Sequence, residues 1–187
     1  MTYESATTQR SIRNRRVTMI GAALVATALY FGYLTEQNNR ARAFLTGLRQ
    51  SDPALYLDEL RRLDGFNAFL RAYREIRGFS NFGPQPPSFL VGRWTMRNAP
   101  VRMLPNTQSA VCPRPFMIDY GHVRITEPKD ITDRASYRLS DGNMLEIRTR
   151  DHGRLSVQIV AFGSSIDYLV FTPPGADAPV YAYRCAI

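Results

Sequence analysis

The hydrophobic pattern divides the chain into three regions. Residues 17–34 form an uncharged, mostly apolar run of about the length that a helix needs to cross a bilayer core. Residues 35–78 carry apolar positions at helical spacing, and residues 89–187 carry short runs of alternating or β-branched residues. The pattern predicts an α+β protein with one N-terminal transmembrane helix, a short helical neck and a C-terminal antiparallel β-barrel of about eight strands.

Local signals set boundaries within the helical neck. Asp52 can cap a helix N-terminus and Pro53 suits the first helical position, so a helix is expected to begin there. Asp64 and Gly65 then interrupt the pattern. The helix that follows carries an apolar stripe, which we interpret as a candidate partner face; packing against the chain's own β domain is the alternative. The stripe consists of Phe66, Phe69, Leu70, Tyr73 and Ile76.

Residues 79–88 separate the helical and the β-rich regions. They contain three prolines and no periodicity, which predicts a stiff linker. Beyond them, turn signals such as Asp141-Gly142 lie between successive strand-like runs, with no helix-length interruption. We therefore expect residues 89–187 to form an antiparallel meander that closes into a small barrel.

Two sequence features of this region resemble the lipocalin-like, or calycin, barrels. Gly92-Arg93-Trp94 is similar to the Gly-x-Trp of that family's first strand, and Arg184 is similar to the arginine of its last strand. The resemblance covers residues 88–187 and implies a barrel base in which the Arg184 guanidinium packs across the Trp94 indole beside Gly92. From the residues alone, an equally good interpretation is that Trp94 is an ordinary core tryptophan and Arg184 an exposed strand arginine.

Charges flanking the uncharged run indicate its orientation. Four arginines precede it and favour a cytoplasmic N-terminus, so residues 1–16 are predicted to be a cytoplasmic basic arm that also meets anionic lipid headgroups. Residues 17–34 are then a signal anchor, within which small residues allow close helix packing. The alternative is a cleaved signal peptide, because Ala26-Thr27-Ala28 suits signal peptidase. The arginines are Arg10, Arg13, Arg15 and Arg16, and the small residues are Gly21, Ala22 and Ala26.

The chain has two cysteines, Cys112 and Cys185, and both lie in the region expected outside the cytoplasm. An even pair in an oxidising compartment predicts a disulfide with a structural role. Two buried free thiols are the alternative.

Composition and motifs exclude several classes of function. The net charge is +8, yet the arginines are scattered through every segment, which argues against a nucleic-acid surface. The sequence has no metalloprotease, redox-cysteine, nucleophile-elbow or phosphate-loop motif, and His122 and His152 lack metal-ligand spacing. We therefore expect no enzyme, no cofactor and no metal site.

These features together predict a non-catalytic, single-pass protein of a bacterial inner membrane, with its C-terminal domain in the periplasm. Its expected role is that of an accessory, assembly or stabilising subunit that contacts other subunits of a membrane complex. A tethered barrel that binds a small apolar ligand is one alternative. Another is a barrel that grips a periplasmic protein through its loops, with residues 98–115 as the candidate loop.

Overall fold

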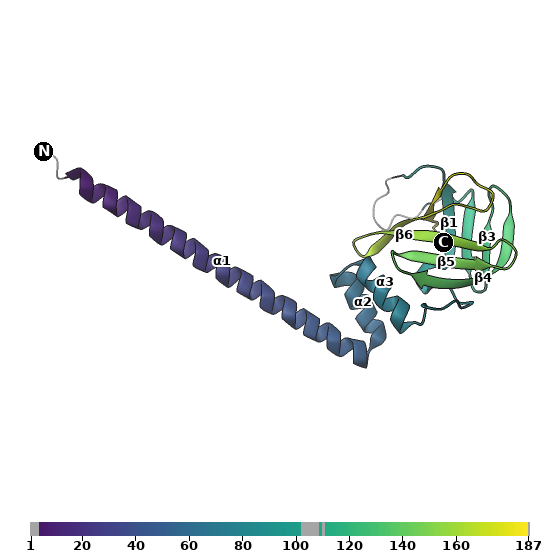
Figure 1. Ribbon diagram of the computed structural model, residues 1–187, viewed down its shortest axis with the longest axis horizontal. Helices are drawn as coiled ribbons and strands as arrows, with labels where there is room; N and C mark the ends of the chain where they lie inside the picture. The colour runs from purple at the N-terminus through teal and green to yellow at the C-terminus, as the bar shows by residue number, and fades with distance from the viewer. Residues whose placement is uncertain (1–3, 102–108, 110, 187) are drawn as a thin grey trace. The chain divides into compact units, whose positions relative to one another are not determined.

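The computed structural model describes residues 4–101, 109 and 111–186, and side chains from Met19 onward. The chain forms two compact units, Met1–Ser51 and Asp52–Ile187. The first is helical, and the second contains two short helices and a closed barrel of eight strands (Figure 1). The predicted α+β class is confirmed.

Helix α1 (Glu4–Ser51) runs without interruption through the uncharged segment and beyond it. The part of α1 whose side chains are described, Met19–Ser51, includes an apolar stretch long enough to cross a membrane, judged by length and composition. Apolar side chains along this stretch are exposed, as Leu24 shows at 65%. The helix continues past Leu34 to Ser51, no proline occurs in between, and Arg40 pairs with Glu36 one turn earlier at 2.8 Å.

Helix α2 (Pro53–Leu63) begins and ends at the predicted signals, and helix α3 (Phe66–Ile76) begins directly after Gly65. The Asp52 carboxylate accepts hydrogen bonds from the amides of Ala54 and Leu55, at 3.1 and 3.0 Å. Gly65 separates the helices with a φ of +82°, where a side chain is strained. A Cβ there would also lie 3.1 Å from the Gly163 carbonyl oxygen, so the corner between the helices sits directly against a barrel hairpin.

The barrel is an antiparallel meander in which each strand pairs with the next along the chain. It closes where the first strand pairs with the last, with Trp94 opposite Arg184. The strands are β1 (Gly92–Arg97), β2 (Pro115–Asp119), β3 (His122–Ile125), β4 (Ile131–Ser140), β5 (Met144–Thr149), β6 (Arg154–Phe162), β7 (Ser165–Phe171) and β8 (Val180–Arg184).

Alternation along the strands places the core inside the barrel. Every second residue of β4 is buried, from Ile131 to Leu139, while the residues between them are exposed or partly exposed. The same two-residue period on β5 and β6 buries Leu145, Ile147 and Val157 completely. The barrel therefore has an apolar interior and an outer surface whose side chains are set by strand register.

Residues 79–88 differ from the expected linker, because their backbone is bonded to the barrel. Strand β3 is short, so the second half of β4 pairs with β5 on one edge and has no neighbouring strand on the edge that faces β3. Gly83 fills this position by exchanging two hydrogen bonds with Tyr137, and the Phe79 carbonyl accepts from the Leu139 amide at 2.9 Å. The prolines of this segment thus lie along the barrel wall, and the boundary between units falls after Ser51 instead.

Candidate interaction surfaces of the barrel unit

The base of the barrel is closed by Trp94, Arg184 and the 3-10 turn Ser88–Leu90. The Arg184 guanidinium carbon lies 5.1 Å from the Trp94 ring centroid, within cation–π range. The same guanidinium donates hydrogen bonds to the carbonyls of Phe89 and Val91, at 2.7 and 2.6 Å. Burial lowers the pKa of Arg184. The structure thus brings together the two residues that the resemblance pairs.

Gly92 and the indole nitrogen complete this base. The Trp94 Nε1 donates to the Leu90 carbonyl at 3.0 Å, and Leu90 is itself fully buried. Gly92 has a φ of +128°, and a Cβ there would lie 3.6 Å from an Arg184 nitrogen. The base therefore closes the barrel structurally: the Arg184 guanidinium and the Trp94 indole contact each other, and both donate hydrogen bonds to backbone carbonyls.

Large side chains occupy the interior of the barrel. Phe116 and Phe171 contact each other with ring centroids 4.4 Å apart, and both are buried. Tyr137 is also inward and fully buried, with its hydroxyl donating to the carbonyls of Asp119 and His122. Burial raises the pKa of Tyr137, so its phenol remains neutral. These residues give the barrel a packed core.

A pocket of about 330 Å³ lies at the rim, where Met96 of β1 and Val180 of β8 meet the loops before β4 and β8. Its volume is near the lower end of the range for small-molecule sites, roughly 300 to 1,000 Å³. The ion pair between Arg114 and Glu127, at 3.0 Å, forms part of its wall, and both side chains are about half exposed. This pocket is where the barrel could take a small ligand.

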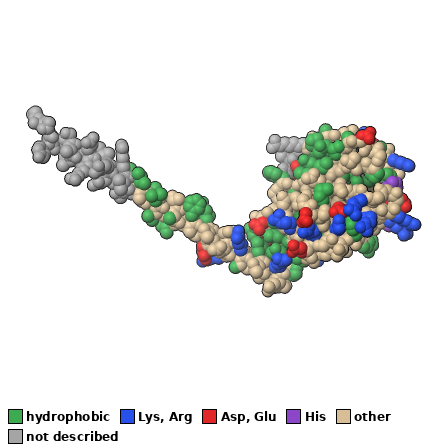
Figure 2. Space-filling model, viewed as in Figure 1, with side chains coloured by type: hydrophobic (Ala, Val, Ile, Leu, Met, Phe, Trp, Pro, Cys, Tyr) green, Lys and Arg blue, Asp and Glu red, His purple; other side chains and the backbone are tan. Residues whose placement is uncertain are grey.

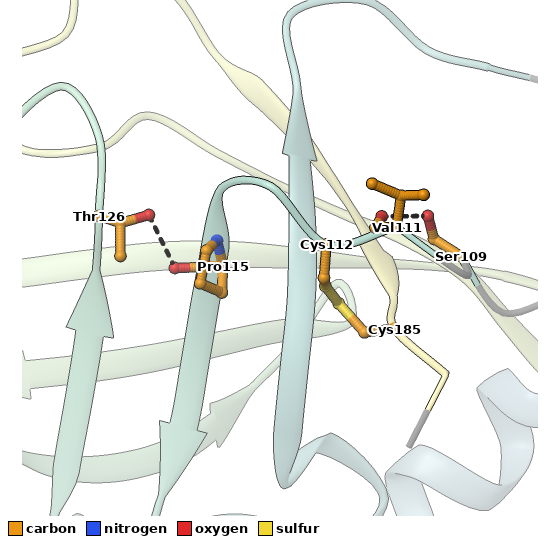
Figure 3. The surroundings of a disulfide bond; sticks show 6 residues. All are labelled: Ser109, Val111, Cys112, Pro115, Thr126 and Cys185. Atoms are coloured by element: carbon orange, nitrogen blue, oxygen red, sulfur yellow. Dashed lines mark hydrogen bonds between the residues drawn. A yellow bond between two sulfur atoms is a disulfide. The ribbon is translucent and has the colours of Figure 1, made fainter.

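Cys112 and Cys185 form the disulfide, with their Cα atoms 6.0 Å apart. Figure 3 shows the bridge beside Ser109 and Val111, whose hydroxyl and carbonyl are hydrogen-bonded at 2.6 Å. The Ser109 amide also donates to the Arg184 carbonyl at 2.8 Å. The bridge thus joins the loop after β1 to the end of β8. Of the candidate contact loop, residues 102–108 and 110 lie outside the described residues.

The apolar stripe on α3 is covered by the chain itself, so it is not a free partner face. Phe66, Phe69 and Tyr73 all contact the ring of Phe89, with centroids 5.4, 5.4 and 5.0 Å away. Leu70 is buried as well, and Ile76 is partly buried. The alternative considered from the sequence, packing against the β domain, is the arrangement found.

Polar contacts fix these helices to the barrel hairpins. The Phe66 amide donates to the Gly163 carbonyl at 2.8 Å, and the Arg61 guanidinium donates to the Ser164 carbonyl at 2.6 Å. Arg74 of α3 forms an ion pair with Asp141, at 2.7 Å, in the turn between β4 and β5. The helices and the barrel are therefore one body.

No protein-family model, curated protein or solved structure matches the chain.

The small residues predicted to pack in the membrane and the arginines of the predicted cytoplasmic arm fall on α1. Gly21, Ala22 and Ala26 are exposed along this helix, and a Cβ at Gly21 would meet nothing within 4 Å. The side chains of Arg10, Arg13, Arg15 and Arg16 lie outside the described side chains. Helix packing in the membrane and the direction of insertion stay predictions.

Asp133 is an ionisable residue whose environment the sequence did not reveal. It points inward from β4, is 5% exposed, and accepts a hydrogen bond from the Asp151 amide at 2.8 Å. The His152 ring nitrogen lies 3.2 Å from the same carboxylate. Burial opposes the charged form, but bonds from Asp151, His152 and the Arg134 amide outweigh it and lower the pKa of Asp133. The carboxylate organises the turn between β5 and β6.

The outer surface of β6 to β8 presents partly exposed apolar and aromatic side chains. Val160 lies opposite Tyr168, and Val170 lies opposite Tyr181, so all four project outward together. We call these four residues the tyrosine face. The rings of Tyr168 and Tyr181 are 5.8 Å apart, and Phe162 at the end of β6 is 71% exposed. The sequence signal for this face is the presence of tyrosines at the outward positions of β7 and β8.

The outer surface of β4 to β6 is different, because it gathers arginines. Figure 2 shows basic side chains concentrated over β4 and β5. Outward positions there hold Arg134 and Arg138 on β4, Arg148 on β5 and Arg154 on β6, which we call the basic face. The arginines are scattered along the sequence, so the sequence does not show this grouping. The four residues come together only through strand register.

Within the residues that the structure describes, no group of three or more His, Cys, Asp and Glu side chains could hold a metal ion. Among the described residues of the barrel unit, the features that remain available for recognition are the rim pocket, the tyrosine face and the basic face.

Proposed function

We propose that the chain is a non-catalytic, single-pass protein of a bacterial inner membrane, and that it serves as an accessory, assembly or stabilising subunit of a membrane complex. In this proposal α1 is the anchor, the N-terminus is cytoplasmic and the barrel unit is periplasmic. The uncharged stretch of α1 supports the anchor, and the disulfide between Cys112 and Cys185 supports an oxidising compartment.

The observation that carries the proposal is the packed interior of the closed barrel. Fully buried side chains such as Phe116, Leu145 and Ile147 occupy the space in which a barrel carrier holds its ligand. A rigid barrel with a filled interior offers its outer surface for recognition. The tyrosine face suits such contact, because tyrosine is enriched in the centres of protein interfaces.

We also propose that the barrel is lipocalin-like. The support is the contact between Trp94 and Arg184 at the barrel base, together with the next-neighbour order of the eight strands. A shared barrel type supports a common architecture but does not identify a function, so the function is argued from the surfaces of the barrel.

Binding of a small apolar ligand is the second candidate function. The rim pocket favours it, with Met96 and Val180 as apolar lining at the mouth of the barrel. A ligand there would sit between the loops and not inside the barrel.

Native mass spectrometry tests the two functions against each other. The full-length protein would be extracted in mild detergent from its own membranes at natural abundance. Stoichiometric co-purifying subunits support the subunit role, and a lone chain with a small adduct supports the ligand role. A lone chain without adduct in every mild detergent contradicts both.

A matched pair of variants connects the result to the tyrosine face. Replacing Tyr181 by Ser is expected to weaken subunit retention, because it removes a large contact at an outward position. Replacing the exposed Thr132 of β4 by Ala, at an outward position on a different part of the barrel, is expected to leave retention unchanged.

A further inference from the structure

Three of the four arginines of the basic face, Arg138, Arg148 and Arg154, surround one aromatic ring. Phe82, in the segment bonded along β4, has the guanidinium carbons of Arg138, Arg148 and Arg154 at 4.7, 4.0 and 5.7 Å from its centroid. Guanidinium groups that stack on a ring keep their N–H edges available for hydrogen bonds. The ring therefore holds the arginines in place without neutralising them.

Positive charge exceeds negative charge at this site. Glu146 is the carboxylate that lies among these arginines. Arg138 donates to both of its oxygens, at 2.8 and 2.7 Å, and a guanidinium nitrogen of Arg154 lies 3.4 Å from one of them. The Arg138 hydrogen bond holds the pKa of Glu146 below its ordinary value, so Glu146 is already ionised and engaged. In the described part of the chain, the guanidinium groups of Arg134 and Arg148 have no carboxylate partner.

The strand register places two of these arginines where the repulsion between their charges opposes folding. Arg148 and Arg154 are directly opposite each other on β5 and β6, and both are exposed. Like charges at directly opposed positions destabilise an antiparallel pair. Both side chains point away from the core, so the barrel interior does not require arginine at either position, and their contact within the fold is the stacking on Phe82.

We propose that the basic face docks an acidic segment of a partner protein, an inference that rests on the proposed subunit role. Arginine forms paired hydrogen bonds with carboxylates, and two arginines on facing strand positions can receive neighbouring acidic side chains. The face has little to insert into a bilayer, because no large exposed apolar residue lies among the described outward positions of β4 and β5. Protein carboxylates therefore suit it better than an anionic membrane surface.

Fluorescence anisotropy with a labelled hexaglutamate peptide tests the docking. The full-length chain would be used in nanodiscs of phosphatidylcholine, with a hexaglutamine peptide as the uncharged comparison. We expect hexaglutamate to bind, with an affinity that falls as salt is raised, and hexaglutamine not to bind. Reversing one charge, in R148E, is expected to weaken hexaglutamate binding by about tenfold or more.

R93E is the matched control. Arg93 is an exposed residue of β1, away from β4 to β6 along the barrel, and the variant has the same net charge as R148E. It is expected to change the affinity for hexaglutamate less than about twofold. R148E also loses the contact between Arg148 and the Phe82 ring, so its melting curve is recorded to show that the variant is folded at the temperature of the binding assay. Equal loss of binding in both variants would overturn the docking site, since it would report net charge only.

Two further outcomes separate this inference from the subunit role. Binding of phosphatidylglycerol vesicles that R148E abolishes, with no binding of hexaglutamate, would overturn the protein partner in favour of lipid headgroups. Co-purifying subunits that R148E retains in full would overturn docking at the basic face and leave the subunit role in place. Hexaglutamate binding by a chain that never co-purifies with subunits would instead overturn the subunit role on which the inference rests.

Discussion

Gly83 and Tyr137 exchange two backbone hydrogen bonds, with N···O distances of 3.1 and 2.7 Å, although one lies in a proline-rich segment and the other in the middle of β4. This pairing occupies the strand edge that the short β3 leaves open. It also brings Phe82 to the arginines of the basic face. A segment with the composition of a linker is thus part of the barrel wall.

Replacing Gly83 by Pro should destabilise the barrel unit. Proline removes the amide that donates to the Tyr137 carbonyl, and leaving that group unpaired costs about 1 to 3 kcal/mol. Gly83 to Ala is the control, because a Cβ there meets nothing within 4 Å. Thermal melting of the full-length protein in detergent, followed by near-ultraviolet circular dichroism, measures both. Equal melting temperatures for the proline and alanine variants would contradict the role of this pairing.

The sequence predicted the elements whose signals are local. Asp52 and Pro53 mark the start of α2, and alternation along β4 marks its inward and outward residues. Closure into an eight-stranded meander followed from tight turns and the lack of intervening helices. These features depend on neighbouring residues, so a single sequence contains them.

The features that the sequence did not predict depend on contacts between distant segments. The hydrogen bonds between Gly83 and Tyr137 exist because β3 is shorter than β4. Amino-acid composition does not determine the length of a strand. The α3 stripe has the same periodicity whether its cover is a partner or Phe89. The opposition of Arg148 and Arg154 requires the register of β5 and β6, which pattern alone leaves open.

Replacing Arg184 by Lys should loosen the barrel base. Lysine keeps the charge but lacks the planar group that contacts Trp94 and donates to the carbonyls of Phe89 and Val91 together. We expect a loss of roughly 1 to 3 kcal/mol in the free energy of unfolding. Chemical denaturation monitored by Trp94 fluorescence measures it, with Arg93 to Lys as the control on the same barrel. A loss no larger than that of the control would contradict a structural base at this site.

Removing the disulfide should destabilise the barrel unit without affecting membrane insertion. The bridge spans a sequence separation of 73 residues. Closing a loop of this length contributes about 4 kcal/mol in the chain-entropy model. Cys112 to Ser should therefore lower the melting temperature under oxidising conditions, while carbonate extraction of membranes still retains the chain. Reductant should lower the melting temperature of the unmodified protein and have no further effect on the variant; an effect of equal size on both would contradict the prediction.

The buried carboxylate of Asp133, which contacts the exposed His152, predicts how stability depends on pH. The folded-state pKa of Asp133 lies below its ordinary value of 3.8, because burial is outweighed by the hydrogen bonds that the carboxylate accepts. The charged carboxylate therefore contributes stability above 3.8, and this contribution is lost as the pH falls from there through the folded-state pKa.

Asp133 to Asn should accordingly melt at a lower temperature than the unmodified chain at pH near 7, and the difference should shrink as the pH is lowered past the ordinary pKa of 3.8. Asp177 to Asn, at an exposed position of the loop before β8, is the control and should follow the unmodified chain throughout. Melting curves of the three proteins in detergent between acidic and neutral pH measure the effect. A difference that stays constant over this whole range would assign the loss to packing of the turn and contradict an electrostatic contribution from the carboxylate.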